Sequence, residues 1–139
     1  MTTDDTRGGV LASGDYEGAT AEELARRTAE DRLGGAASPK ALFQRRGVVT
    51  LKQDRLVLGS WGNGGDLVLR RPDITSVDTT YTELYGRVIG GLLNAGKPLI
   101  LGTTRSGQLY LLIDRKDYVE TTHDRAWEQR IKDWLWEGR

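Results

Sequence analysis

Residues 43–61 read FQRRGVVTLKQDRLVLGSW and hold the clearest structural signal of the chain. Apolar and polar residues alternate on both sides of residues 52–54, and Leu56 and Leu58 share one face because side chains alternate along a strand. A short polar connection between two alternating segments is typical of a β-hairpin. We therefore expect one strand on each side of the turn, over residues 41–51 and 55–60.

The same alternation recurs further along the chain. Two leucines of residues 99–103 have the same period as three large aliphatic residues of 108–113, and the turn Arg105-Ser106-Gly107 lies between them. This arrangement predicts a second hairpin. The expected strands beyond the first hairpin are residues 66–70, 74–79, 99–103 and 108–113.

Residues 81–97 are harder to interpret. Their large apolar side chains fit a helical spacing, but Gly86, Gly90 and Gly91 interrupt it. We expect one irregular strand and a long loop there.

Residues 122–137 return to helical spacing. Four apolar residues, Trp127, Ile131, Trp134 and Leu135, recur at positions i, i+4, i+7 and i+8. This stripe predicts an amphipathic helix, and a sheet of short strands needs such an apolar cover. Trp136 falls outside the stripe, so we expect it to be exposed.

The first 35 residues have a different character. Residues 1–19 contain scattered apolar side chains among Thr, Asp and Gly, so we expect a disordered arm. Thr20 and Glu23 have the spacing of a capping box, which predicts a helix and linker over residues 20–35. The apolar stripe of this helix is thin, so it either covers the main domain lightly or serves as a docking segment. We expect the main domain over residues 36–139.

Composition excludes several classes of function. The chain has 139 residues, and its 20 Lys plus Arg balance 20 Asp plus Glu, which disfavours specific nucleic-acid binding. It has no cysteine and one histidine, which excludes thiolate zinc sites and any site that needs two imidazoles. No apolar run approaches the roughly 20 residues of a bilayer span. We expect a cytoplasmic protein that holds no metal.

Two motifs each contain part of a functional site but lack other residues that the site needs. Residues 91–97 reproduce the GxxxxGK pattern of a phosphate-binding loop, but Pro98 stands where a hydroxyl residue and a helix are needed. Histidine is a residue type that serves as a general base, but no nucleophile is near His123 in sequence, and we expect it at the surface of the first helical turn. We therefore expect no cofactor and no catalytic residue.

The order of these elements resembles the pleckstrin-homology-like (PH-like) superfold, particularly the small bacterial PH-like and GRAM-like domains. The hairpin of residues 43–61, the β-branched residues of Ile74-Thr75-Ser76-Val77 and a final helix with an inward-facing Trp127 or Trp134 carry the resemblance. It covers residues 41–137. It implies a mainly β fold, in which an antiparallel β-barrel of six to seven strands is capped by the C-terminal helix and accompanied by a short N-terminal helix.

The resemblance also implies a candidate ligand site. In a PH-like fold the connections after the first, third and sixth expected strands lie at the same open end, and each is cationic here. Similar domains bind phosphorylated headgroups or acidic peptides in this way. Residues 52–55 lack the denser Lys/Arg pattern of the eukaryotic members, so we do not expect phosphoinositide recognition. The candidate anion-binding residues are Lys52, Arg55, Arg70, Arg71 and Arg105.

A second candidate surface is apolar. Trp61 lies in a glycine-rich stretch, and Leu92 and Leu93 lie in the irregular segment. These side chains either tuck under the barrel or, where exposed, suit a partner protein or self-association. The leading hypothesis is a non-catalytic domain that binds a partner protein, and the alternative is a peripheral adaptor on anionic membranes. An enzyme of unrecognised type remains a third hypothesis.

Overall fold

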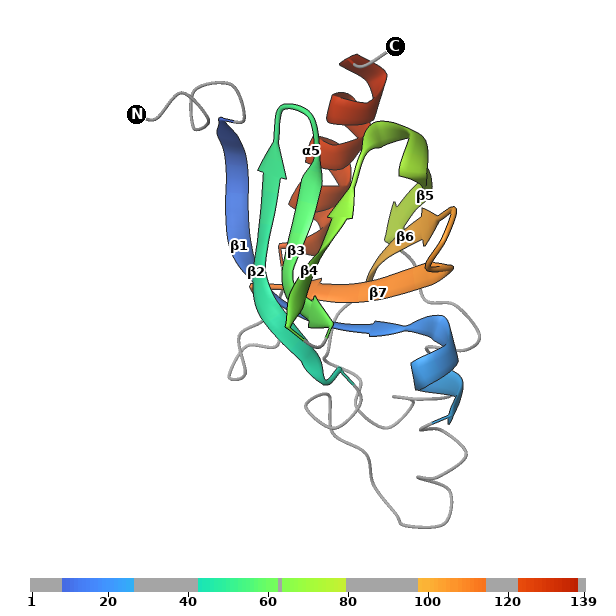
Figure 1. Cartoon of the computed structure of the whole chain (residues 1–139). Helices are drawn as coiled ribbons and strands as arrows, with labels where there is room; N and C mark the ends of the chain where they lie inside the picture. Colours follow the sequence, from blue (N-terminus) through green and yellow to red (C-terminus); the bar gives the residue numbers. More distant parts are fainter. Residues whose placement is uncertain (1–8, 27–42, 63, 80–97, 115–122, 138–139) are drawn as a thin grey trace.

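A single antiparallel sheet dominates the computed structural model, which describes residues 9–26, 43–62, 64–79, 98–114 and 123–137. Its strand order is β4-β3-β2-β1-β7-β6-β5. The sheet curls into a half-barrel, and the C-terminal helix α5 packs on its inner face (Figure 1). The elements are β1 (Val10–Thr20), β2 (Arg45–Lys52), β3 (Leu56–Gly62), β4 (Gly65–Leu69), η1 (Arg71–Asp73), β5 (Ile74–Thr79), β6 (Leu99–Thr103), β7 (Gln108–Ile113) and α5 (Asp124–Glu137).

The predicted fold class, a mainly β curled sheet with a C-terminal helix, is confirmed. Strands β5, β6 and β7 begin and end at the predicted residues. Leu99 lies opposite Leu111 and Leu101 opposite Leu109, which is the predicted register of the second hairpin. In the first hairpin, the Lys52 N–H donates to the Arg55 carbonyl oxygen at 2.8 Å and closes the predicted turn.

Helix α5 supplies the aromatic part of the core. Trp127, Ile131 and Trp134 are buried against the inner faces of the strands, and Leu135 packs at the margin. Trp136 is 73% exposed, as the stripe predicts. Buried aromatic side chains of this size each remove a large apolar area from water, so they fix α5 on the sheet.

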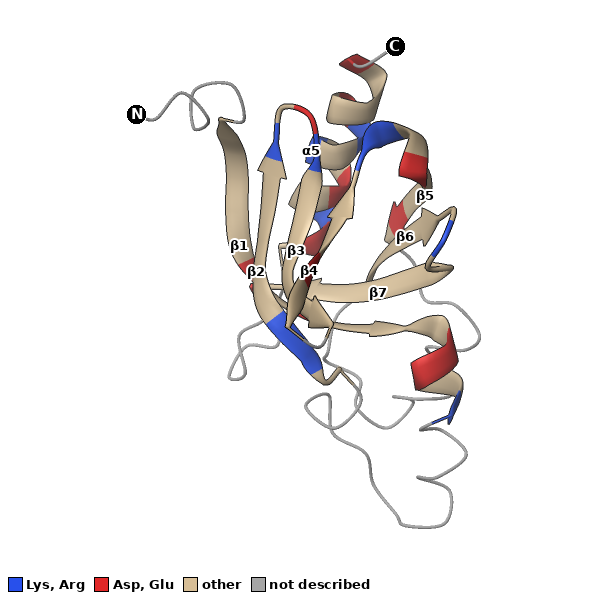
Figure 2. Cartoon of the chain, in the orientation of Figure 1, with Lys and Arg blue, Asp and Glu red and all other residues tan. Residues whose placement is uncertain are grey.

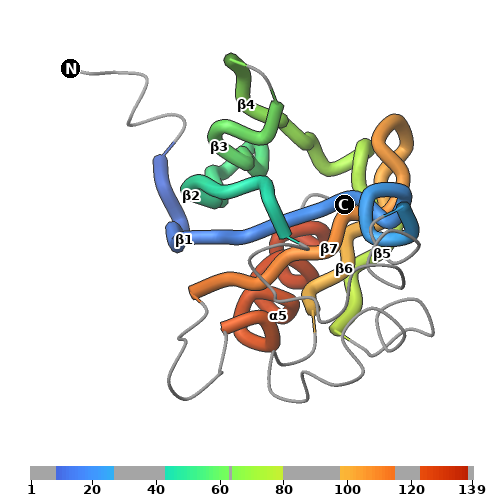
Figure 3. The backbone as a smooth tube through the Cα atoms, turned by 90° about the horizontal axis from the view of Figure 1, so that it is seen from below, coloured from blue at the N-terminus to red at the C-terminus, as the bar shows by residue number. Residues whose placement is uncertain are grey.

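Strand β1 corrects the prediction of a disordered arm over residues 1–19 for residues 10–19, whereas residues 1–8 lie outside the described ranges. Residues 10–18 pair with β2 and residues 16–20 pair with β7, so β1 joins the two halves of the sheet (Figure 3). Tyr16 is the one large aromatic side chain of β1, and the apolar side chains that cover this strand come from neighbouring elements. The local composition of residues 10–20 therefore does not indicate a strand. The folded domain therefore includes residues before 36.

Trp61 of β3 is one of the side chains that cover β1. A bulge between Leu58 and Gly62 interrupts the β3–β4 register, with Ser60 at φ 57° and its N–H donating to Asp66 Oδ1 at 2.9 Å. Across this bulge β3 has two more residues than β4, and Trp61 lies on the inner face, where it is 8% exposed. A Cβ on Gly18 would lie 2.7 Å from the Trp61 ring, so the indole can pack against β1 at this position because the residue is glycine.

The outer face of the sheet differs between its two halves. Ile100 of β6 and Tyr110 and Leu112 of β7 point away from the α5 core, yet all three are buried. On the outer face of β2 and β4, Val48 is 47% and Val68 is 44% exposed. The β6–β7 hairpin is therefore covered on both faces, whereas the β2–β4 segment is covered on one.

The predicted helix after Thr20 is present in its described part. Residues 21–26 are helical, and the capping box is formed: the Thr20 N–H donates to Glu23 Oε1 at 2.9 Å, and the Glu23 N–H donates to Thr20 Oγ1 at 3.0 Å. Leu24 is fully buried, which favours the packing hypothesis over a free docking segment. The rest of the predicted 20–35 segment, and the irregular 81–97 segment, lie outside the described residues.

Candidate functional site

Three connections of the sheet lie next to one another at one end of the half-barrel, where Figure 2 shows several cationic segments. Arg71 Nε donates to the Trp134 carbonyl oxygen at 2.9 Å, and Trp134 Nε1 donates to the Gln53 carbonyl oxygen at 2.9 Å. The Thr104 N–H donates to the Asp73 carbonyl oxygen at 3.0 Å. Trp134 of α5 thus links the β2–β3 turn to the β4–β5 connection, and the β6–β7 turn bonds directly to the β4–β5 connection.

The five predicted cations differ in what they can still bind. The Arg71 guanidinium stacks 4.5 Å from the Trp134 ring centroid, and Arg55 pairs with Asp54 at 2.9 Å. These two side chains already have partners within the fold. The candidates with neither an ion pair nor an aromatic ring contact in the described part of the chain are Lys52, Arg70 and Arg105. Binding of an anion at this end stays a prediction.

A cleft of about 170 Å³ lies between strand β4 and the β6–β7 turn. Leu67, Val68 and Leu69 of β4 form one wall, and residues 103–106 form the other. Arg105 is the cationic residue of the lining, and Asp73 is the acidic one. The cleft therefore combines an apolar strand, hydroxyl side chains and one guanidinium.

Some backbone groups of β4 point to the side of the strand where no described strand pairs with it. Lys52 and Arg55 form a hydrogen-bonded pair at the end of the β2–β3 hairpin. Because hydrogen-bonded positions alternate along an antiparallel pair, the backbone N–H and C=O groups of Leu56 and Leu58 point away from β2 and toward β4. Their partners on β4 are Leu69 and Leu67, so the N–H and C=O of Val68 point away from β3. Strand β4 is the last strand of the described sheet, so no described strand pairs with Val68 on the side opposite β3.

This edge is a feature that the sequence reasoning missed. Alternation of Leu67 and Leu69 identifies a strand, but the position of that strand in the sheet follows from the order of all its neighbours. The glycine-rich run before residue 66 indicates a turn and gives no sign of an edge. The edge position of β4 can be identified only from the order of the strands in the sheet.

A surface groove of about 610 Å³ runs over β1, β2 and β7 and contains His123. His123 Nδ1 lies 2.8 Å from Asp114 Oδ2, and the Asp114 N–H donates to the Asp15 carbonyl oxygen at 2.7 Å. His123 is exposed, as predicted. Its contacts join the end of β7 to the start of α5, where its N–H donates to the Ile113 carbonyl oxygen at 2.9 Å.

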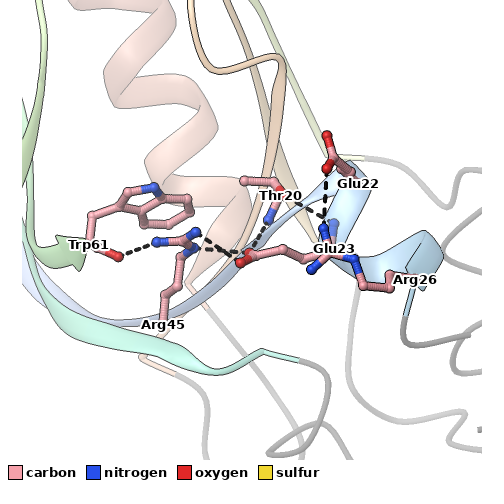
Figure 4. A network of polar contacts seen from close by, with 6 residues as sticks. All are labelled: Thr20, Glu22, Glu23, Arg26, Arg45 and Trp61. Carbon is pink, nitrogen blue, oxygen red and sulfur yellow. Dashed lines mark hydrogen bonds and ion pairs between the residues drawn. The ribbon is translucent and has the colours of Figure 1, made fainter. Parts of the chain in front are cut away.

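A polar network ties the N-terminal helix to the sheet (Figure 4). Arg45 donates to both carboxylate oxygens of Glu23, at 2.9 and 2.8 Å, and to the Trp61 carbonyl oxygen. Its guanidinium also lies 4.6 Å from the Trp61 ring centroid. Burial alone would raise the pKa of Glu23, but the hydrogen bonds from Arg45 and Thr20 outweigh it and lower the pKa. The network positions the helix and leaves Arg45 fully engaged.

The predicted apolar partner surface is not formed by Trp61. The indole is buried in the core and lies 6.0 Å from the Tyr16 ring, so the buried alternative holds for it. Leu92 and Leu93 lie outside the described residues. Exposed apolar side chains instead occur on β1, β2, β4 and α5, at Val10, Leu11, Val48, Val68 and Trp136.

The described residues contain no group of three or more His, Asp or Glu side chains placed to hold a metal ion. No helix in the same ranges is long and apolar enough to cross a bilayer.

Comparison with known proteins supports the fold alone. No family model and no curated protein matches this sequence. Among solved structures, the chain is similar to the C-terminal domain of an unknown protein from Leishmania infantum, with a TM-score of 0.53 and 11% sequence identity. The match covers 95% of this chain and 89% of that one. The chain therefore shares its architecture with that domain.

Proposed function

We propose that this chain is a non-catalytic binding domain of PH-like architecture whose partner is a protein. The observation that carries the proposal is the free edge of β4 beside a cleft. An unpaired strand edge recognises another polypeptide through its main chain, because an added strand satisfies both sets of backbone groups. The neighbouring cleft supplies side-chain contacts that give such pairing a preference.

Site-specific photo-crosslinking tests this function. A benzoylphenylalanine residue replaces Val68 on the β4 edge in one variant and Ala126, which is exposed on α5, in a matched control. The variants are expressed in cells of the source organism and irradiated. We expect discrete protein adducts from position 68 that position 126 does not give. Adducts common to both positions, or no protein adduct from position 68, would contradict the proposal.

A second candidate function is peripheral binding to anionic membranes. It is favoured by the three adjoining connections, in which Arg70 and Arg105 are exposed. Cations grouped at one surface attract anionic lipid, and salt weakens that attraction. Co-sedimentation with phosphatidylserine vesicles across a salt series tests it. Salt-sensitive binding lost in the double variant Arg70→Glu, Arg105→Glu would support this candidate, and no binding at low salt would remove it.

A further inference from the structure

We infer that the cleft beside β4 binds an extended peptide segment that carries a carboxylate, with the peptide added to β4 as a further strand and its carboxylate held by Arg105. This inference rests on the proposed function and names the chemistry of the partner. It is distinct from the membrane candidate, whose ligand would have no backbone to pair with β4.

The length of the free edge sets the length of the added strand. By alternation, the backbone groups of Asp66 point to the same side as those of Val68. At Arg70 the edge ends, because its N–H donates to Asp73 Oδ2 and its carbonyl oxygen accepts from the Asp73 N–H, both at 2.9 Å. Residues 66–68 therefore offer pairing to a short segment, and η1 limits the addition at one end.

Side chains beside the edge favour a β-branched residue in the peptide. Val57 of β3 lies directly opposite Val68 on the outer face, and the Val68 side chain is 44% exposed. A peptide side chain placed next to Val68 would extend this cross-strand row. Side chains that lie directly opposite each other on one face of a sheet stabilise the pairing of its strands.

Charge in the cleft favours a carboxylate. Arg105 lines the cleft, is exposed and has no carboxylate partner in the described ranges. The one acidic residue of the lining, Asp73, accepts the Arg70 N–H through Oδ2. A guanidinium binds a carboxylate through two parallel hydrogen bonds, which gives direction as well as attraction. The Asp or Glu side chain, or the terminal carboxylate, of an added strand supplies that group.

A random dodecamer peptide library displayed on phage tests the inference against the intact protein. Selection is carried out on the wild type and on Val68→Pro, which removes the outward N–H. It is repeated on the matched control Val68→Thr, which keeps the N–H and the β-branched shape. A fourth target, Arg105→Gln, removes the charge and keeps a polar side chain.

We expect the wild type and Val68→Thr to enrich alternating peptides with one acidic residue at a fixed position. Val68→Pro is expected to enrich none of them. Arg105→Gln is expected to keep the alternation, lose the acidic preference and bind the selected peptides about tenfold or more weakly, as loss of a charge-assisted hydrogen bond implies. Thermal melts establish that each variant is folded.

The outcomes separate this inference from the proposed function. Peptides that bind Val68→Pro and the wild type equally would overturn the β4 site but leave a protein-binding function standing. Failure to enrich any peptide, together with vesicle binding, would overturn both. Where Val68→Pro does not fold, amide chemical shifts of the wild type decide: a selected peptide must perturb residues 66–68 and Arg105, and perturbation confined to other strands refutes the site.

Discussion

The β6–β7 hairpin and the β2–β4 segment belong to one sheet but differ in how many of their faces are buried. Both faces of β6 and β7 are buried, and their sequences LILGT and QLYLLI are almost continuously apolar. Strands β2 to β4 bury one face in the shared hydrophobic core, and Val48 and Val68 stand exposed on the other. The covered half is buried on both faces, and the uncovered half has the face and the edge on which we propose that a partner binds.

The largest expected effect comes from truncating outward-facing residues in the two halves. Leu112→Ala removes a fully buried side chain of β7 and should lower the free energy of unfolding by about 2–5 kcal/mol. Val48→Ala removes a half-exposed side chain of β2 and should change it by less than about 1 kcal/mol. Urea denaturation measures both. Similar losses at the two positions would mean that the halves do not differ.

A second effect concerns close strand contact within the uncovered half. A Cβ on Gly47 would lie 2.1 Å from the Gly59 carbonyl oxygen, whereas a Cβ on Gly62 meets nothing within 4 Å. Gly47→Ala should therefore lower stability by about 1–3 kcal/mol, because backbone must move. Gly62→Ala, the matched control, should stay within about 0.5 kcal/mol of the wild type. Equal melting temperatures for the two variants would refute the close contact.

The smallest effect involves one buried hydroxyl that links β1 to β3. Tyr16 Oη donates to the Gly59 carbonyl oxygen at 2.6 Å, so Tyr16→Phe should cost about 1 kcal/mol at neutral pH. Burial raises the pKa of Tyr16 from 10.0 to about 12, with a smaller upward contribution from Asp66 and an opposing one from Arg45.

The sign of the resulting pH dependence follows from that shift. The raised pKa favours the protonated phenol in the folded state, so its contribution is fully present below pH 10 and is lost toward pH 12. The wild type should lose about 1.4 kcal/mol per pH unit in this window relative to Tyr16→Phe. Urea titrations of both proteins at several alkaline pH values measure this. Parallel pH profiles would show that Tyr16 is not shielded from water.

Strands with their own apolar alternation could be predicted from the sequence. β5, β6 and β7 begin and end as expected, and the Trp127, Ile131 and Trp134 stripe faces the core. β1 could not be predicted in this way, because its glycines and polar residues form a strand only where β2 and β7 pair with it. Long-range pairing of this kind leaves no local pattern.

The candidate site was predictable to a smaller extent. Sequence placed Arg70 and Arg105 in connections at one end, and the Thr104 to Asp73 hydrogen bond joins those connections. It could not show that Arg71 stacks on Trp134, since 63 residues separate them. It also placed Trp61 in a loop, because a bulge changes which side chains face inward and has no simple sequence signature.

Amide hydrogen exchange of the free protein tests the central claim, the open edge of β4, most directly. We predict that the Val68 amide exchanges close to its intrinsic rate, while the Leu67 and Leu69 amides, bonded to β3, and the Leu111 amide of β7 are protected. Protection of Val68 equal to that of Leu67 and Leu69 would show that its N–H already has a partner, and would contradict the account of β4 as a binding edge.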